Sequence, residues 1–419
     1  MREMKNSGIA WIGTIPQDWQ LSKIGSLYTQ RNKKVSDKDY QPLSVTMQGI
    51  LPQLATAAKT DDGDNRKLVR VGDFAINSRS DRRGSCGISP LDGSVSLINI
   101  ILTPRTAMHP GYYNWLFHTT LFADEFYKWG HGIVADLWTT RWQEMKSISV
   151  PVPEYAEQER IAAFLDAECA EIDAVLEQTR ASIEEYKKLK QAVITQAVTK
   201  GIRGDRPMKD SGIEWIGEIP KEWDCKKVKY VTSISRGIFN HRPRNDERYY
   251  GGEYPFIQTG DVAGAQKYIE SYSQTLNELG KSVSKCFPKG TLTMTIAANV
   301  GDAAILGFDA FFPDSVVGFI PNADINDEYL YYIFKAMKPE FVRTAIKSTQ
   351  LNLNVERIRD LFVPVVVQKS EQIEIAEYLN TKCADIDALI AKKQQYLTEI
   401  ENYKKSLIYE YVTGKKEVV

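Results

Sequence analysis

An internal repeat constrains this chain more than any other feature. The segment MKNSGIAWIGTIPQDWQLSKI at 4–24 matches MKDSGIEWIGEIPKEWDCKKV at 208–228 with one constant offset. A second pair of matching segments begins at Pro151 and at Pro364, again with a nearly constant offset. The chain therefore consists of a lead-in motif, a diverged block and a helical segment, followed by the same three parts again.

Both helical segments have the pattern of one very long helix. Each runs for about 40 residues without internal Pro or Gly, which corresponds to roughly 60 Å at 1.5 Å per residue. Residues at steps of three and four form a mostly apolar seam of coiled-coil type in both segments. The seam positions include Ile161, Leu165, Ile172, Val175, Ile183 and Tyr186 in the first and Ile375, Leu379, Ile386, Leu389 and Tyr403 in the second. We expect the two seams to pair with each other, antiparallel, within one chain.

The two diverged blocks, at about 20–150 and 225–363, contain short β-rich runs separated by Gly, Pro and Asp. The predicted fold class is therefore α+β, with two mixed α/β domains separated by a pair of long antiparallel coiled-coil-like helices and with a pseudo-two-fold internal repeat. The predicted divisions are a first domain at 1–155, a central helix at 156–201, a second domain at 202–368 and a C-terminal helix at 369–419. The four tryptophans of the lead-in motifs are predicted to serve packing, because they stand beside Ile and Pro with no accompanying cation.

Charge is balanced over the whole chain, with 53 Lys and Arg against 54 Asp and Glu, which excludes a uniformly basic nucleic-acid binder. Basic residues nevertheless gather in two places. The stretch from Cys225 to Asn245 holds three Lys and three Arg without an acid, and the predicted loop from Asn77 to Gly84 holds three Arg and one acid. Such side chains can bind phosphates or base edges, although solvated loops have the same composition.

Signatures of catalysis, cofactors and metals are missing from the sequence. The five cysteines and four histidines are scattered, without the spacing of a zinc site. A phosphate loop ending in Gly280-Lys281-Ser282 needs a glycine at position 275, where Thr275 stands. We therefore expect no catalytic residues, no cofactor and no metal. Since no stretch approaches 18 uninterrupted apolar residues, we expect a cytoplasmic chain without contact to a membrane.

The order of these motifs resembles the specificity subunits of type I restriction-modification systems. The resemblance rests on the two SGIxWIGxIPxxW lead-ins, the EQExIAxFLD helix opening after Pro151 with its looser copy at Gln372, and the Val-Thr endings at Thr199 and Thr413. It implies two target-recognition domains that each read one half of a bipartite double-stranded DNA site, with the helix pair setting the spacing. It also implies partnership with two methyltransferase subunits and with restriction/translocase subunits, which carry the chemistry. The specificity subunit itself would be non-catalytic.

Loop position and side-chain type give the candidate DNA contacts. They are Gln48, Asn77, Arg79, Arg82, Arg83 and His131 in the first block, and Arg236, Arg242, Arg244, Gln258, Asn299 and Gln350 in the second. Three alternatives stay open at this stage. A coiled-coil adaptor without a nucleic-acid role would use the same helices, a stand-alone nuclease or methyltransferase would need motifs that the chain lacks, and a complex that only methylates would need no restriction subunit.

Overall fold

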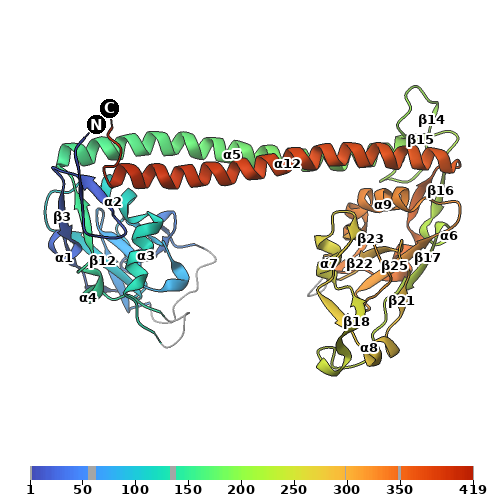
Figure 1. Cartoon of the computed structure of the whole chain (residues 1–419), viewed down its shortest axis with the longest axis horizontal. Coiled ribbons are helices and arrows are strands. Elements are labelled where there is room, and N and C mark those ends of the chain that lie inside the picture. Colours follow the sequence, from blue (N-terminus) through green and yellow to red (C-terminus); the bar gives the residue numbers. More distant parts are fainter. Residues whose placement is uncertain (1, 55–62, 133–137, 298, 348–350, 419) are drawn as a thin grey trace. The chain divides into compact units, whose positions relative to one another are not determined.

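The computed structural model describes residues 2–54, 63–132, 138–297, 299–347 and 351–418. The chain divides into two compact units: unit 1 comprises Met1–Arg180 with Gln394–Val419, and unit 2 comprises Ala181–Lys393. Each unit holds one diverged block together with part of both long helices, α5 (Tyr155–Lys200) and α12 (Lys369–Val412) (Figure 1). The domain boundaries stated above, which keep each helix whole, remain a prediction.

Unit 1 is built around an antiparallel sheet with the strand order β10-β9-β12-β4. Its strands are β4 (Tyr28–Gln30), β9 (Phe74–Asn77), β10 (Cys86–Ile88) and β12 (Asn99–Pro104). A three-stranded sheet follows the order β11-β8-β5, and two-stranded pairs complete the unit. These strands are β5 (Lys34–Val35), β8 (Arg66–Val69), β11 (Gly93–Val95), β6 (Leu43–Thr46) with β7 (Gly49–Pro52), and β3 (Gln20–Lys23) with β13 (Ser149–Val152). The short helices are α1 (Ile24–Leu27), α2 (Pro110–Phe117), α3 (Thr120–Lys128) and α4 (Trp142–Met145).

Unit 2 has a five-stranded sheet with the order β17-β25-β22-β23-β19. Its strands are β17 (Thr232–Arg236), β19 (Tyr268–Ile269), β22 (Leu292–Thr295), β23 (Ala303–Leu306) and β25 (Val316–Pro321). A second sheet follows the order β20-β18-β24-β21, and β16 pairs with β28. These strands are β18 (Tyr250–Phe256), β20 (Gln274–Leu276), β21 (Cys286–Phe287), β24 (Ala310–Phe311), β16 (Asp224–Lys227) and β28 (Phe362–Val365). The short helices are α6 (Val228–Val231), α7 (Thr259–Gly264), α8 (Glu278–Ser282), α9 (Asp327–Ala336), α10 (Lys338–Thr344) and α11 (Val355–Asp360).

The two sheets repeat one topology, which confirms the predicted α+β fold and internal repeat. The order β10-β9-β12-β4 of unit 1 corresponds to β23-β22-β25-β17 of unit 2, with β19 added at one edge. A glycine with positive φ precedes each central strand, Gly72 at 84° and Gly290 at 83°. Such a turn favours glycine, which explains why this residue survives in both diverged blocks.

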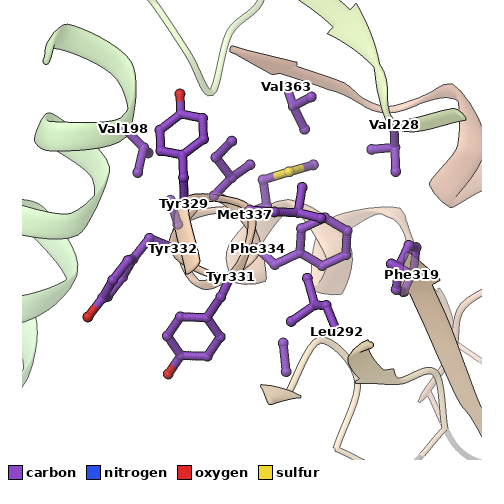
Figure 2. Packing of buried hydrophobic residues seen from close by; sticks show 14 of the residues in the cluster. Val198, Val228, Leu292, Phe319, Tyr329, Tyr331, Tyr332, Phe334, Met337 and Val363 are labelled. Carbon is purple, nitrogen blue, oxygen red and sulfur yellow. The ribbon is translucent and has the colours of Figure 1, made fainter. Parts of the chain in front are cut away.

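Aromatic and aliphatic side chains of α9 form the centre of the unit 2 core. Tyr329 and Phe334 of α9 are fully buried because apolar residues cover most of the circumference of the helix, and Met337, which caps its C-terminal end, is buried with them. Figure 2 shows Phe334 on the side of Leu292 and Phe319 of the sheet, whereas Tyr329 points to the opposite side, toward Val198 of α5. In unit 1, α2 occupies the corresponding place with Tyr113 and Phe117, which lie close to Tyr28 and Phe74.

Within each unit the two long helices run antiparallel. In unit 1 the ring of Phe164 on α5 lies 4.4 Å from that of Tyr411 on α12, and Lys404 pairs with Asp173 at 2.6 Å. In unit 2 the equivalent pair is Lys190 with Asp387, also at 2.6 Å. The same two positions of the repeat thus form a cross-helix ion pair in both units, as the antiparallel prediction requires.

The predicted seam is wrong at three positions. Val175, Leu389 and Tyr403 are 39 to 54 % exposed, whereas Leu176, which was not assigned to the seam, is buried. Spacing alone predicts a straight seam, whereas a helix with 3.6 residues per turn drifts relative to a strict seven-residue repeat. Near its first turns each helix also packs against its own diverged block, through side chains such as Ile161 and Leu165. The buried face therefore changes along the helix.

The lead-in tryptophans Trp19 and Trp223 are 1 % exposed, which confirms their packing role. Each lead-in forms a hairpin, β1 (Met4–Asn6) with β2 (Thr14–Pro16) and β14 (Met208–Asp210) with β15 (Glu218–Pro220). The expectation that no cation accompanies these rings is wrong. Arg2 lies 5.6 Å from the centre of the Trp19 ring, and Arg206 lies 6.0 Å from that of Trp223. Both arginines stand two residues before the start of the matched frame, which therefore extends further than the sequence comparison indicated.

A buried glutamine near the start of each long helix binds the backbone of its own block. The Gln158 side chain accepts the N–H of His109 at 2.9 Å and donates to the carbonyl of Pro153 at 2.9 Å. Gln372 accepts the N–H of Asn326 at 2.7 Å and donates to the carbonyls of Asp324 and Val366 at 3.0 and 2.9 Å. The shared contact explains why the glutamine recurs even though the second helix opening is a looser copy of the first.

Candidate nucleic-acid interface

In unit 1 the arginine-rich segment after β9 lies beside a second loop. Arg79 and His131 both form an isolated β-bridge with Thr139, and the N–H of Thr140 donates to the carbonyl of Ser78 at 3.0 Å. The segment continues through the short 3₁₀ helix η1 (Ser80–Arg82). The structure therefore brings together four of the six residues predicted in this block: Arg79, Arg82, Arg83 and His131.

Three side chains of this cluster, those of Arg82, Arg83 and His131, are exposed and have acidic neighbours, whereas Arg79 is half-buried. The Arg82 side chain is 69 % exposed with Asp81 at 3.6 Å, and Arg83, 53 % exposed, pairs with Asp124. His131 is 69 % exposed and lies 3.7 Å from Glu144. Ion pairs at such exposed positions are weak, so a phosphate could replace the carboxylates at little cost.

Gln48 and Asn77 differ from each other in their surroundings. Gln48 is exposed at the tip of the hairpin β6–β7, as a contact residue should be. Asn77 is only 6 % exposed and is the last residue of β9, so its predicted place on an exposed loop is wrong. The strand begins with the apolar run at 74–76 and extends one residue further, to Asn77. Its side-chain oxygen accepts the N–H of Arg79 at 3.0 Å and thereby orients the start of the arginine segment.

In unit 2 three of the predicted arginines converge on one residue, Asp314. The guanidinium groups of Arg242 and Arg244 form ion pairs with its two carboxylate oxygens. Arg236 donates through Nε to the backbone carbonyl of the same residue. The Arg242 and Arg244 side chains are 56 and 46 % exposed, and that of Asp314 is 30 % exposed. We call these four residues the Asp314 cluster.

The other predicted residues of unit 2 lie apart from the Asp314 cluster in sequence. Gln258 precedes α7 and donates to the side chain of Gln274 at 2.9 Å. Asn299 is exposed in the turn between β22 and β23, and Gln350 lies outside the described residues.

The loop after the central strand packs against a hairpin in both units. In unit 2, Ala297 forms an isolated bridge with Asn352, and the N–H of Leu353 donates to the carbonyl of Ile296 at 2.9 Å. These contacts repeat those of Arg79 with Thr139 and of Thr140 with Ser78 in unit 1. The position is therefore shared, but its side chains are not: unit 1 has an arginine there and unit 2 has an alanine.

Sequence reasoning did not find Asp314. This residue is isolated between Pro313 and Ser315, and its partners lie 70 to 78 residues earlier in the chain. No local pattern indicates such a contact.

Within the described part of the chain, no group of three or more His, Cys, Asp or Glu side chains is arranged to hold a metal ion. The helices of these same segments also include none with the length and apolar run that a bilayer crossing needs. All five cysteines are free thiols, and burial raises the pKa of Cys86 to about 12, which keeps this thiol protonated near neutral pH. The chemistry that the exposed clusters offer is the binding of anions by arginine.

Comparison with known proteins connects these observations. Residues 220–401 match the family model described as the type I restriction modification DNA specificity domain. The chain is 34 % identical over 187 residues to the type I restriction enzyme MjaIX specificity subunit of Methanocaldococcus jannaschii, covering 43 % of this chain and 41 % of that protein. It is 23 % identical to the MjaVIII specificity subunit of the same organism, covering 96 % of this chain and 94 % of that protein. The match to a further relative, the putative MjaX specificity subunit, spans 61 % of its length.

Solved structures show the same fold. A chain from a study of complex assembly and conformational transition of the type I R-M system matches with a TM-score of 0.75 at 14 % identity, over 96 % of this chain and 99 % of that one. The HsdS subunit from Thermoanaerobacter tengcongensis matches with a TM-score of 0.51 at 16 % identity, over 96 % of this chain and 98 % of that one.

Proposed function

Because the chain belongs to the family of type I restriction-modification specificity subunits, we propose that it recognises a bipartite double-stranded DNA target, each unit reading one half. The observation that carries this proposal is the presence of an exposed arginine cluster in both repeated units, in a chain whose total charge is balanced. Arginine can bind a phosphate or the edge of a guanine through two parallel hydrogen bonds.

The two clusters occupy different positions of the common fold. In unit 1 the arginines follow the central strand β9, and in unit 2 they follow the edge strand β17. Such a difference is what two domains need in order to read different base sequences on one scaffold. Within the proposal, phosphate contacts set the register and base contacts supply the specificity.

We further propose that the two long helices set the distance between the half-sites. α5 has 46 residues and α12 has 44. Helices rise about 1.5 Å per residue, so removing seven residues at facing positions of both helices shortens the pair by about 10 Å and keeps the seam in phase. The unread spacer should then become shorter by about 3 base pairs at 3.4 Å per pair. A target with an unchanged spacer would contradict this part of the proposal.

The proposed partners are two methyltransferase subunits and restriction/translocase subunits, which would carry out the chemistry while this chain remains non-catalytic. In a complex that only methylates, the restriction subunits would be absent. Purification of the chain with its neighbouring gene products, followed by mass measurement of the intact assembly, distinguishes these two cases.

Selection of duplexes from a random pool by the assembled complex tests DNA recognition. Arg82→Ala with Arg83→Ala should relax one block of the selected sequence, and Arg242→Ala with Arg244→Ala should relax the other. Matched controls are Arg180→Ala in unit 1 and Arg203→Ala in unit 2, which remove exposed arginines that pair with long-helix glutamates. If the wild-type complex retains no sequence selectively, the chain is an adaptor without a nucleic-acid role.

A further inference from the structure

The Asp314 cluster is held together by backbone contacts as well as by charge. The N–H of Gly237 donates to the carbonyl of Val316 at 2.9 Å. A Cβ atom at Gly237 would lie 2.2 Å from the carbonyl oxygen of Pro313, which no side chain could tolerate. Glycine at this position therefore allows the segment that follows β17 to lie directly against the segment that carries Asp314.

Additional hydrogen bonds fix the arginines beside this carboxylate. The Nη1 atom of Arg242 donates to the carbonyls of Phe239 and His241 at 2.8 and 2.7 Å, and its Nη2 atom faces Asp314 at 3.5 Å. The carbonyl of Arg244 accepts the hydroxyl of Tyr250. The Asp314 carboxylate thus pairs with two guanidinium groups, each of which can also bind a phosphate.

The charges of the cluster do not balance. Three guanidinium groups contact Asp314, two of them at its carboxylate and that of Arg236 at its backbone carbonyl, so the cluster carries three positive charges against one negative charge. A phosphate that binds Arg242 or Arg244 must compete with Asp314, and the carboxylate repels that phosphate. Phosphate contacts supply the part of DNA affinity that is independent of sequence, whereas they do not distinguish one base from another.

We propose that Asp314 is a specificity-determining residue, which weakens the binding of unit 2 to non-target DNA by competing with phosphates for Arg242 and Arg244. On the correct duplex, base contacts elsewhere in the unit compensate for this competition. On other duplexes they do not. Raising the ratio of two affinities by a repulsive element is a general route to specificity. This inference rests on the proposed function.

The test compares Asp314→Asn with wild type in the assembled complex, by titrating a target duplex and a non-target duplex of equal length. Asn keeps the shape of the side chain and removes the negative charge. We expect the affinity for the non-target duplex to rise roughly five- to tenfold, the affinity for the target to rise less, and the discrimination ratio to fall. The slope of log K against log salt for the non-target duplex should steepen by about one.

Three variants serve as controls. Asp324→Asn removes an exposed carboxylate from the same unit and should leave the discrimination ratio unchanged. The backbone carbonyl of this residue, which binds the Gln372 side chain, is kept in the variant. Asp314→Glu keeps the charge and should restore most of the discrimination. Combining Asp314→Asn with Arg242→Ala and Arg244→Ala should abolish the gain in non-target affinity, because the arginines are its source.

The possible outcomes distinguish a failure of the inference about Asp314 from a failure of the proposed function. Suppose that the wild-type complex discriminates between the two duplexes and that Arg244→Ala weakens its binding to DNA. If Asp314→Asn then leaves the discrimination ratio unchanged, the inference about Asp314 is overturned and the proposed function stays intact. Equal weakening on both duplexes with a lower unfolding temperature also overturns it, because Asp314 would then only stabilise the fold. A wild-type complex without discrimination overturns the proposed function and this inference together.

Discussion

Replacement of Gln372 by alanine should destabilise unit 2 by about 3 kcal/mol. The side chain is fully buried and makes three hydrogen bonds to backbone groups. Each such bond contributes about 1 kcal/mol net, and a polar group left buried without a partner costs at least as much. For a unit of about two hundred residues, this change corresponds to a fall in unfolding temperature of roughly 6 to 12 °C.

The repeat supplies an internal comparison for this prediction. Gln158→Ala in unit 1 removes two hydrogen bonds and should cost about 2 kcal/mol, so it should be the milder of the two substitutions. Gln196→Ala, an exposed glutamine on the unit 2 part of α5, should change stability by less than about 0.5 kcal/mol.

Calorimetry gives the unfolding temperatures, and hydrogen exchange of peptides that contain Asn326 and α9 locates the effect. The amide of Asn326 should exchange faster in Gln372→Ala because it loses its acceptor. If Gln372→Ala unfolds at the same temperature as Gln196→Ala and protects Asn326 equally well, the buried amide does not stabilise the junction of helix and domain, and the reasoning is refuted.

Three further predictions concern buried and titratable groups. Arg206→Met should lower the free energy of unfolding in urea by about 3 kcal/mol, because it leaves the Glu371 carboxylate, whose side chain is 6 % exposed, without its arginine. The double variant Arg206→Met with Glu371→Met should recover part of that loss. An equal or larger loss in the double variant would argue against the pair. At pH 8 a thiol reagent should modify exposed Cys286 in the folded chain and reach Cys86, whose pKa burial raises to about 12, only after unfolding; early labelling of Cys86 would contradict its burial. Burial tends to raise the pKa of Glu328, but hydrogen bonds from Asn380, Lys267 and Tyr268 outweigh this effect and lower it below its ordinary value of 4.5. Since the folded-state pKa is the lower one, the stabilisation of the fold by Glu328 should be complete above pH 4.5 and disappear as the pH falls through the lowered pKa. The urea midpoint of wild type should therefore fall more steeply below pH 4.5 than that of Glu328→Gln. Parallel falls of the two midpoints would contradict this account.

The parts of the fold that depend on repeated or periodic residues could be predicted from the sequence. The equivalence of the two lead-ins, the burial of Trp19 and Trp223 and the antiparallel helix pair all follow from residues that recur at constant offsets or helical spacing. Arg2 and Arg206 were also within reach, because the lead-in offset aligns them as well. The matched frame used for the prediction begins at Met4 and Met208 and therefore leaves them out.

Features that depend on distant contacts could not be predicted in this way. The burial of Asn77 is decided by the length of β9, which extends one strand residue beyond the apolar run. Tyr403 is exposed because another face of α12 packs against the partner helix, and residue spacing alone does not determine which face that is. Asp314 joins arginines that lie at least 70 residues away, so only the folded chain reveals that they share a carboxylate.

The candidate DNA contacts remain predictions from side-chain type and exposure. The structure places Arg79, Arg82, Arg83 and His131 together and gathers three arginines around Asp314. The bases that each unit reads could not be predicted from the sequence, because base recognition depends on the geometry of the complex with DNA.

Mapping of methylated bases in the genome of a strain that expresses this chain with its partner subunits tests the central claim most directly. The account predicts one motif made of two short specified blocks separated by a spacer of fixed length and free sequence, and it predicts that this motif disappears when the chain is deleted. A continuous motif without an unread spacer, or a methylation pattern that survives the deletion, would contradict the account.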